Sequence, residues 1–247
     1  MGGEIALPKI SIIIVTYNAA AFLNNCLQSI YRQSYPNIEI IILDGQSTDG
    51  TVDILRQNAR YITFWKSEPD AGIYDAMNKA LDHVKGQWVY FLGADDELLD
   101  DFTTMTRRLK DESTIYYGSV LKEGKKYLGY LTPYQQAKTN FCHQAMLFPA
   151  QVFKKYKFDT KYAISADHVM NMQLGKDKDF KFDFVDLVIA KYNHTGISSV
   201  KKDELFEKDK AGLILKHYGI NVWARFLFKK LKARKKRLTK RKGEDTI

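Results

Sequence analysis

The chain has 247 residues, of which 45% are hydrophobic, and these values fit one large globular domain with a proper core. Its two cysteines, Cys26 and Cys142, are too few and too far apart for a disulfide framework or a zinc cluster, so we expect a reducing, cytoplasmic compartment. The first residues lack the pattern of a secretory signal, and no apolar run approaches the roughly 20 residues of a membrane-spanning helix. We therefore expect a protein that does not cross a membrane.

The net charge of +9 comes from one end of the chain. Residues 225–247 hold 11 of the 38 Lys and Arg and 2 of the 29 Asp and Glu, which leaves 27 residues of each sign in residues 1–224. An uncharged body does not resemble a nucleic-acid clamp, so we expect no nucleic-acid partner. A basic tail on such a body is typical of an enzyme that is directed to a particular location.

The first hundred residues alternate between strands and amphipathic helices. Continuous β-branched runs such as KISIIIVTY predict strands that are buried on both faces. We predict strands at residues 9–17, 37–45, 61–67 and 87–93, and helices at residues 19–33, 47–59 and 72–84. Helix 72–84 is expected to turn these side chains inward: Ile73, Met77, Ala80, Leu81 and Val84. This alternation favours a doubly wound, mostly parallel α/β sheet.

The second half of the chain is less regular. We predict strands at residues 113–121, 125–131, 142–149 and 180–192, and helices at residues 164–176 and 200–219. The expected organisation is a domain over residues 1–219, with one half at about 9–100, a mixed half at about 101–219, and a separate tail at 220–247.

Polar side chains follow each of the first four predicted strands. The strand ends carry Thr16, Tyr17 and Asn18 on the first, Asp44 on the second, Ser67 to Asp70 on the third, and Asp95 and Asp96 on the fourth. Open α/β sheets bind ligands in the crevice beyond the carboxyl ends of their parallel strands, so we expect these groups to form one site. Two adjacent carboxylates are also common in plain turns.

The glycine motifs that bind phosphate in dinucleotide dehydrogenases and P-loop ATPases are absent from the sequence. Carboxylates alone repel phosphate, so an acidic crevice would need a divalent cation to bind a phosphorylated ligand. This reasoning favours a metal site over a plain turn at Asp95 and Asp96.

Four ordered segments carry a resemblance to a known family: ISIIIVTYNAAAFLNNCLQSI, IEIIILDGQSTDGT, SEPDAGIYDAMNKAL and WVYFLGADD. Together they resemble family 2 of the nucleotide-sugar glycosyltransferases, which have the GT-A fold. The resemblance is strong over residues 9–100 and weak over residues 140–200, and it is greatest to bacterial enzymes of capsule, exopolysaccharide and lipopolysaccharide synthesis. It implies an inverting transfer of a hexose or N-acetylhexosamine from a nucleotide sugar to a glycan hydroxyl.

The resemblance also implies roles for residues at the donor side. Thr16, Tyr17 and Asn18 would line the base and ribose pocket. Asp44 would accept a hydrogen bond from the uracil imide, which favours UDP over GDP or dTDP, although dTDP has the same imide. The ribose and sugar of the donor would lie near Asp70, Asp75, Asn78 and Lys79. Alternatively, Asp44 belongs to a plain Asp-Gly turn and the other four are solvated surface residues.

Residues 94–96, ADD, stand where the family has its D-x-D metal motif, with Ala94 in place of the first Asp. By the resemblance, Asp95 would contact ribose or metal-bound water. Asp96 would bind Mg²⁺ or Mn²⁺, and the cation would bridge the diphosphate and act as Lewis acid for the leaving group.

The acceptor side falls in the second half. The segment SADHVM resembles the family's acidic motif at a helix start, which makes Asp167 the candidate base that takes the proton of the acceptor hydroxyl. His143 would line the acceptor side, and His194 is a candidate further metal ligand beside a loop over the diphosphate. The alternatives are a carboxylate favoured by the helix dipole at Asp167 and a core or loop histidine at His143.

The tail has the pattern of a basic amphipathic helix. Over residues 220–242, helical spacing places Ile220, Trp223, Phe226, Leu227 and Leu231 on one side and basic residues on the other. We expect it to attach the enzyme peripherally to the anionic cytoplasmic face of the plasma membrane, where acceptors of such enzymes are often sugars on a polyprenyl diphosphate. Alternatively, the aromatic side packs on the body.

Two rival functions share parts of this pattern. A nucleotidyltransferase that makes sugar nucleotides also alternates strands with helices and binds metal, but it normally has a glycine-rich basic loop after the first strand, where this chain has TYNAAAF. A non-catalytic protein that binds glycans or nucleic acid is the other alternative.

Overall fold

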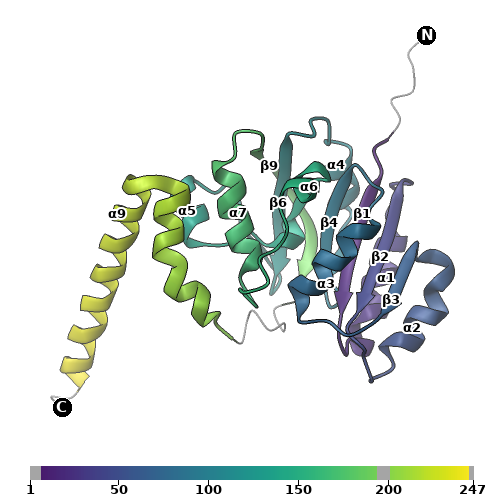
Figure 1. Cartoon of the computed structure of the whole chain (residues 1–247), viewed down its shortest axis with the longest axis horizontal. Helices are drawn as coiled ribbons and strands as arrows, with labels where there is room; N and C mark the ends of the chain where they lie inside the picture. The colour runs from purple at the N-terminus through teal and green to yellow at the C-terminus, as the bar shows by residue number, and fades with distance from the viewer. Residues whose placement is uncertain (1–6, 194–200, 245–247) are drawn as a thin grey trace, which may run out of the picture.

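A computed structural model of the protein describes residues 7–193 and 201–244, with side chains of the last helix described as far as residue 233 (Figure 1). The described strands form one sheet in the order β3-β2-β1-β4-β8-β6-β9-β5, and β7 pairs with β6 outside this path. The strands are β1 (Ile10–Thr16), β2 (Ile38–Asp44), β3 (Phe64–Ser67), β4 (Trp88–Gly93), β5 (Glu97–Leu98), β6 (Thr114–Lys122), β7 (Lys125–Tyr127), β8 (Met146–Pro149) and β9 (Lys181–Tyr192).

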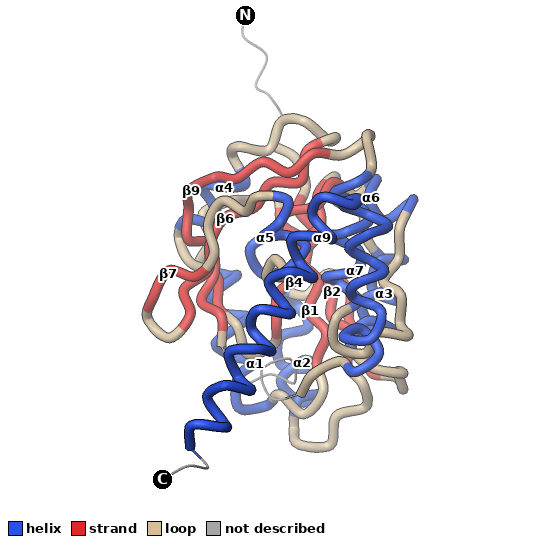
Figure 2. Tube along the Cα trace, turned by 90° about the vertical axis from the view of Figure 1, so that its left-hand side faces the viewer, coloured by secondary structure: helices blue, strands red, loops and turns tan. Residues whose placement is uncertain are grey.

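Helices cover both faces of this sheet. Figure 2 shows α3, α6 and α7 together on one side of the central strands. The helices are α1 (Ala20–Tyr31), α2 (Thr51–Asn58), α3 (Ile73–Ala80), α4 (Asp101–Thr106), α5 (Pro133–Lys138), α6 (Gln151–Lys155), α7 (Ala166–Lys176) and α9 (Glu204–Glu244). Short 3₁₀ turns lie at Ala59–Tyr61, Leu81–His83 and His143–Ala145.

The apolar strand β1 explains why both faces are covered. Ile12 and Ile14 belong to a core shared with α1, α2 and α4, whereas Ile13 belongs to a second core shared with α3, α6 and α7. Successive side chains of a strand point to opposite faces, so a continuous run of isoleucines supplies both cores. This confirms the expected doubly wound sheet.

The first four strands pair in parallel, as predicted: β1 lies between β2 and β4, and β3 lies beside β2. The second half is mixed, because β8 is antiparallel to both β4 and β6, and β6 is parallel to β9. Residues 125–127 pair antiparallel with β6 as a short hairpin, so the strand predicted at 125–131 ends earlier.

Two further details of the predicted elements are wrong. The segment 142–149 begins with a 3₁₀ turn, His143–Ala145, and only Met146–Pro149 is a strand. Ile73, expected to point inward, is 37% exposed at the start of α3 and lines a pocket. An exposed apolar residue at that position faces a hollow rather than the core.

The last helix bends at Gly219, where φ is +78°, a value that favours glycine because it has no Cβ. Its first part packs against α5 and α7, and its second part begins with Trp223 and Phe226 against the core and then runs away from the body in Figure 1. The bend coincides with the predicted boundary of the tail at residue 220. None of the described helices is long and apolar enough to cross a membrane.

Candidate active site

The parallel register aligns the polar ends of the first strands. Thr16 is the direct partner of Asp44, which is in turn the partner of Ser67, while Gly93 ends β4 beside Val15. The polar strand ends therefore lie at one edge of the sheet, and their forming a single binding site stays a prediction. This polar edge begins at β3 and reaches Asp95 and Asp96 after β4.

Asp44 is buried, with 1% of its surface exposed, and organises the loop after β2. Its carboxylate accepts hydrogen bonds from the Ser47 backbone N–H at 3.0 Å, the Ser47 hydroxyl, and the Ser67 hydroxyl at 2.6 Å. The Ser47 hydroxyl also accepts from the backbone N–H of Asn18 at 2.8 Å. Asp44 thus ties together the loops that follow β1, β2 and β3.

An open surface lies beside this network. Tyr17 is 69% exposed, and a Cβ at Gly45 would come within 2.5 Å of the Asp70 carboxylate and 3.5 Å of the Tyr17 ring. Gly45 thus leaves room for the Asp70 carboxylate close to the loop that follows β2. The buried Thr16 hydroxyl at the same edge has no hydrogen-bond partner among the described residues.

Three further residues expected at the donor side make contacts within the protein. Asp75 accepts from the Ala71 backbone N–H at 3.0 Å and pairs with Lys79 at 2.9 Å, and Lys79 also donates to the Pro69 carbonyl at 2.9 Å. Asn78 donates to the Phe158 carbonyl and accepts from the Phe158 N–H, both at 2.9 Å. These side chains fix the loop before α3 and join α3 to the second half.

A pocket of about 320 Å³ lies where the two halves meet, and both Asp95 and Asp167 line it. His143, Tyr74 and Ile73 contribute further parts of its wall. The structure therefore brings together the expected acceptor-side residues and one of the two adjacent carboxylates. Asp70, Asp75, Asn78 and Lys79 do not line this pocket.

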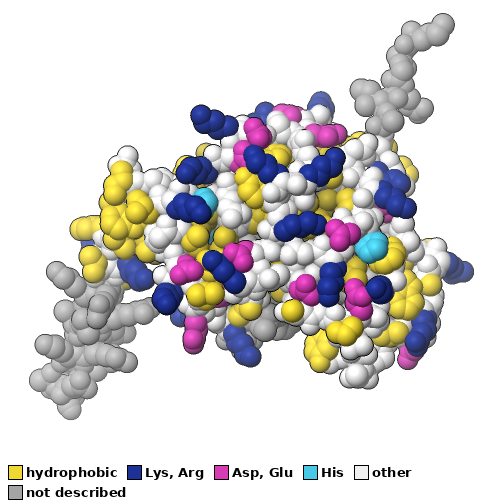
Figure 3. All heavy atoms as spheres, in the orientation of Figure 1, with side chains coloured by type: hydrophobic (Ala, Val, Ile, Leu, Met, Phe, Trp, Pro, Cys, Tyr) yellow, Lys and Arg dark blue, Asp and Glu magenta, His cyan; other side chains and the backbone are white. Residues whose placement is uncertain are grey.

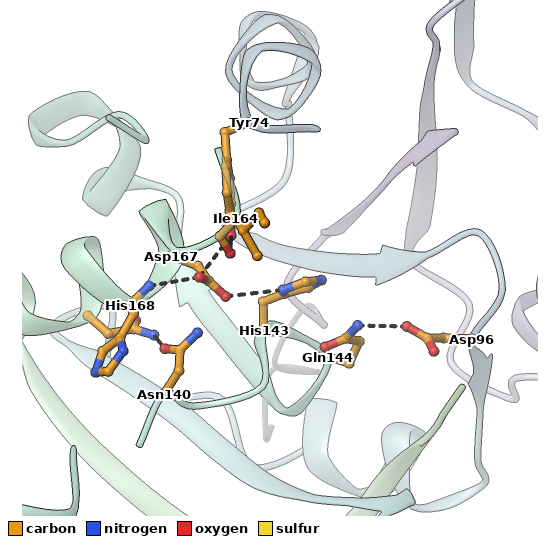
Figure 4. Close-up of polar contacts among 9 residues, drawn as sticks. Tyr74, Asp96, Asn140, His143, Gln144, Ile164, Asp167 and His168 are labelled. Carbon is orange, nitrogen blue, oxygen red and sulfur yellow. Dashed lines mark hydrogen bonds and ion pairs between the residues drawn. The ribbon is translucent and has the colours of Figure 1, made fainter. Parts of the chain in front are cut away.

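Asp167 sits at the start of α7 and is 7% exposed. Its Oδ1 accepts from the Tyr74 hydroxyl and the His168 N–H, both at 2.8 Å, and its Oδ2 lies 3.5 Å from Nδ1 of His143 (Figure 4). Burial raises the pKa of Asp167, but the hydrogen bonds from His143 and Tyr74 outweigh it, so the pKa lies below its usual value. The carboxylate is therefore ionised at neutral pH.

Asp95 and Asp96 form a turn, closed by a hydrogen bond from the Asp96 N–H to the Gly93 carbonyl at 3.0 Å. Asp96 is 1% exposed, and its oxygens accept from Gln144 Nε2 and from the Asn193 N–H, each at 2.7 Å. Burial is the main reason why its pKa rises to about 6. The turn directs one carboxylate into the protein, and the other, Asp95, lines the pocket.

The chemistry of this turn allows a cation without requiring one. Among the described residues, no three His, Cys, Asp or Glu side chains gather into a metal centre. Magnesium is commonly held by one or two carboxylates together with substrate phosphates, and Asp95 on the pocket wall suits that arrangement. His194, the candidate further ligand, lies outside the described residues.

Comparisons with known proteins identify the family. The model of glycosyl transferase family 2 matches residues 11–180. A glycosyltransferase of PGL/p-HBAD biosynthesis from Mycobacterium bovis is 32% identical over 216 residues, which cover 82% of this chain and 84% of the relative. The chain belongs to glycosyl transferase family 2.

Another relative is also named as a glycosyltransferase, and solved structures show the same fold. A teichuronic acid biosynthesis glycosyltransferase of Bacillus subtilis, itself named as putative, is 39% identical over 97 residues, 38% of each chain. Staphylococcus aureus TarS shares the GT-A fold, with a TM-score of 0.69 at 17% identity, over 89% of this chain and 70% of that one. A mannosyltransferase from Pyrobaculum calidifontis, solved with GDP-Man and Mn²⁺, has a TM-score of 0.61 at 20% identity over 85% and 63% of the two chains.

Several pocket residues of this family 2 glycosyltransferase were not predicted from its sequence. Tyr74 donates a hydrogen bond to Asp167, and Gln144 donates one to Asp96. Lys122, Tyr127 and Tyr192 line the pocket. Tyr74 lies within the segment GIYDAMN, where helical spacing indicates only a core residue. Gln144 directly follows His143, and that adjacency was the one signal in the sequence for its position.

The Asn78 contacts lead to a prediction that separates structure from donor binding. Asn78→Ala leaves the buried N–H and C=O of Phe158 unpaired, so we expect a loss of about 2 kcal/mol in unfolding free energy with little change in donor KM. Chemical denaturation and steady-state kinetics measure the two effects. Asn78→Asp keeps one acceptor and serves as the intermediate control. A normal unfolding free energy with a raised donor KM would instead assign Asn78 to the donor.

Proposed function

We propose that this family 2 glycosyltransferase inverts the anomeric carbon of a UDP-linked hexose or N-acetylhexosamine and transfers the sugar to a hydroxyl of a bacterial surface glycan. The observation that carries the proposal is the shared pocket of Asp95, from the nucleotide half, and Asp167, from the acceptor half. A donor that reaches Asp95 and an acceptor that reaches Asp167 would meet inside it.

The side chains around Asp167 support the role of general base. As the acceptor oxygen forms its bond to the anomeric carbon, the bond to the diphosphate oxygen breaks and the hydroxyl proton passes to the Asp167 carboxylate. One displacement inverts the carbon without a covalent enzyme intermediate. Tyr74 and His143 hold the carboxylate in position, and its lowered pKa keeps it ready to accept the proton.

Asp95 and Asp96, after the end of β4, would have different roles. We propose that Asp95 holds the divalent cation, Mn²⁺ or Mg²⁺, because it lines the pocket, and that the buried Asp96 fixes the turn through Gln144 and Asn193. When bound, the cation would neutralise charge on the leaving diphosphate. This modifies the expectation that Asp96 is the metal ligand.

For the nucleoside, we propose that Tyr17 and Asp70 supply the contact surface, together with Thr16 and Asn18, the neighbours of Tyr17 in the chain. A contact between the uracil imide and Asp44 would need access to this buried carboxylate, which already accepts hydrogen bonds from Ser47 and Ser67. A solved TarS complex contains UDP-GlcNAc, which supports a UDP-linked donor.

The names of three relatives bear on the acceptor, and one of them names a lipid-linked sugar as acceptor. The Mycobacterium and Bacillus relatives are named for PGL/p-HBAD and teichuronic acid biosynthesis. A Methanococcus voltae relative, 25% identical over 250 residues, is named for transfer to a dolichyl N-acetylglucosaminyl phosphate. We propose a sugar on a polyprenyl diphosphate at the cytoplasmic face of the membrane.

The second part of α9 supports a peripheral membrane contact. Trp223 and Phe226 pack against the core, which agrees with the alternative that the aromatic side of the tail packs on the body. In contrast, Ile220, Phe228 and Leu231 are 60%, 66% and 60% exposed. Figure 3 shows hydrophobic side chains gathered at the end of the molecule where α9 bends. An exposed apolar side followed by a basic run is typical of a helix that lies in a membrane interface.

The test of the proposed function is nucleoside diphosphate release from a panel of sugar nucleotides with Mn²⁺, Mg²⁺ or EDTA. We expect release from at least one UDP-sugar, and Asp167→Asn should reduce transfer by roughly 10²–10⁴-fold with donor affinity nearly unchanged. Pyrophosphate-dependent chemistry would indicate a nucleotidyltransferase. Binding without release would indicate a non-catalytic protein.

A pair of variants tests the division between the two carboxylates. Asp95→Asn should abolish Mn²⁺-dependent UDP binding, measured by calorimetry. Asp96→Asn should lower the unfolding free energy by about 1–3 kcal/mol, because a single amide oxygen cannot satisfy both the Gln144 and Asn193 donors. If Asp96→Asn is fully stable yet loses metal-dependent binding, the cation belongs to Asp96.

A truncation tests the membrane contact without disturbing the packed aromatic residues. Residues 229–247 carry 10 Lys or Arg and 2 Asp or Glu, and each basic side chain near an anionic leaflet contributes about 1 kcal/mol. Removing them should abolish sedimentation with phosphatidylglycerol liposomes and leave UDP release intact. The full chain with Lys229, Lys230 and Lys232 changed to Gln should bind at least tenfold more weakly. Equal binding by the truncated and full chains would contradict the proposed anchor.

A further inference from the structure

Lys122 stands on the wall of the catalytic pocket with two aromatic rings beside it. Its Nζ lies 5.0 Å from the centre of the Tyr127 ring and 5.9 Å from the centre of the Tyr192 ring, and all three residues line the pocket that holds Asp95 and Asp167. We call these three residues the Lys122 cluster.

The sheet fixes the geometry of the Lys122 cluster. Lys122 ends β6, Tyr127 comes from β7 on one side, and Tyr192 is the register partner of Lys122 on β9. The hairpin between β6 and β7 turns at Glu123 and Gly124, both with positive φ. A cation between rings from two neighbouring strands is a built arrangement rather than a mobile surface lysine.

Within the part of the chain that the structure describes, Lys122 forms no ion pair with an Asp or Glu. Its neighbours are paired: Lys126 with Asp186, and Lys191 with Glu97. The recorded contacts of the Lys122 ammonium are the two aromatic faces, which leave its N–H donors available to an oxygen ligand in the pocket.

We propose that the Lys122 cluster binds an acceptor that carries an anionic oxygen group, a carboxylate or a phosphate, beside the sugar that receives the new bond. The apolar face of a sugar ring packs on tyrosine, and the ammonium forms a charge-assisted hydrogen bond to the anion. This inference rests on the proposed function and adds to it the residues that recognise the charge of the acceptor.

The position of the cluster favours the acceptor over the donor. Lys122, Tyr127 and Tyr192 all belong to the second half, as do His143 and Asp167. The polar edge formed by Thr16, Asp44 and Ser67 belongs to the first half and lies across the sheet, beyond β4. An anion at Lys122 would therefore lie on the same side as the base that takes the acceptor proton.

Lys122→Met tests the proposal, because it keeps the aliphatic length and removes the charge. Lys126→Met is the matched control, since Lys126 lies on the same hairpin and does not line the pocket. Two pairs of probes are measured by saturation-transfer NMR on protein loaded with UDP. They are p-nitrophenyl β-glucuronide against p-nitrophenyl β-glucoside, and N-acetylglucosamine 1-phosphate against methyl N-acetylglucosaminide.

The unchanged protein and Lys126→Met should bind the charged member of at least one pair about tenfold more tightly than the neutral member. Lys122→Met should lose this preference and keep the donor KM for UDP-sugar hydrolysis. A preference in the first pair identifies a carboxylate, and one in the second pair identifies a phosphate.

Three results would overturn the proposal: no charge preference in the unchanged protein, the same preference in Lys122→Met, or a raised donor KM in Lys122→Met with acceptor preference unaltered. The last would place Lys122 on the donor diphosphate. Absence of UDP release from every donor, with the charge preference present, would reject the proposed function and leave the binding site standing.

Discussion

The site depends on the parallel register of β1 with β2 and β4. This register sets Thr16 beside Asp44 and ends β4 next to Val15, so the carboxyl ends of three buried strands stop at one edge. A shift by one residue would exchange the side chains that meet the two cores, so the packing of both cores opposes it. Polar residues just past the strands are therefore held by the burial of isoleucines before them.

Burial also sorts the acidic residues of the site into two kinds. Asp44, Asp96 and Asp167 are nearly inaccessible, and each accepts two or more hydrogen bonds that offset the loss of hydration. Asp70 is exposed, and Asp95 is partly exposed on the pocket wall. The buried carboxylates therefore fix the loops around the site, and the more accessible carboxylates are the ones that a ligand can reach.

The first half of the fold could be predicted from sequence because its signals are local. Continuous apolar runs mark the strands, and the ends of those runs mark the site. The acceptor half could not, because Lys122 and Tyr192 become neighbours only through the pairing of β6 with β9. The sequence also places Asp95 and Asp96 together after β4, but it does not indicate which of the two side chains is buried.

One helix joins the two halves. The loop that holds Asp70 leads directly into α3, which carries Tyr74 to the Asp167 carboxylate and Asn78 to the backbone of Phe158. A displacement of that loop would therefore reach Tyr74 and the Asp167 carboxylate through α3. If Asp70 meets the donor and Asp167 the acceptor, a substitution beneath α3 that alters one site would also be felt at the other.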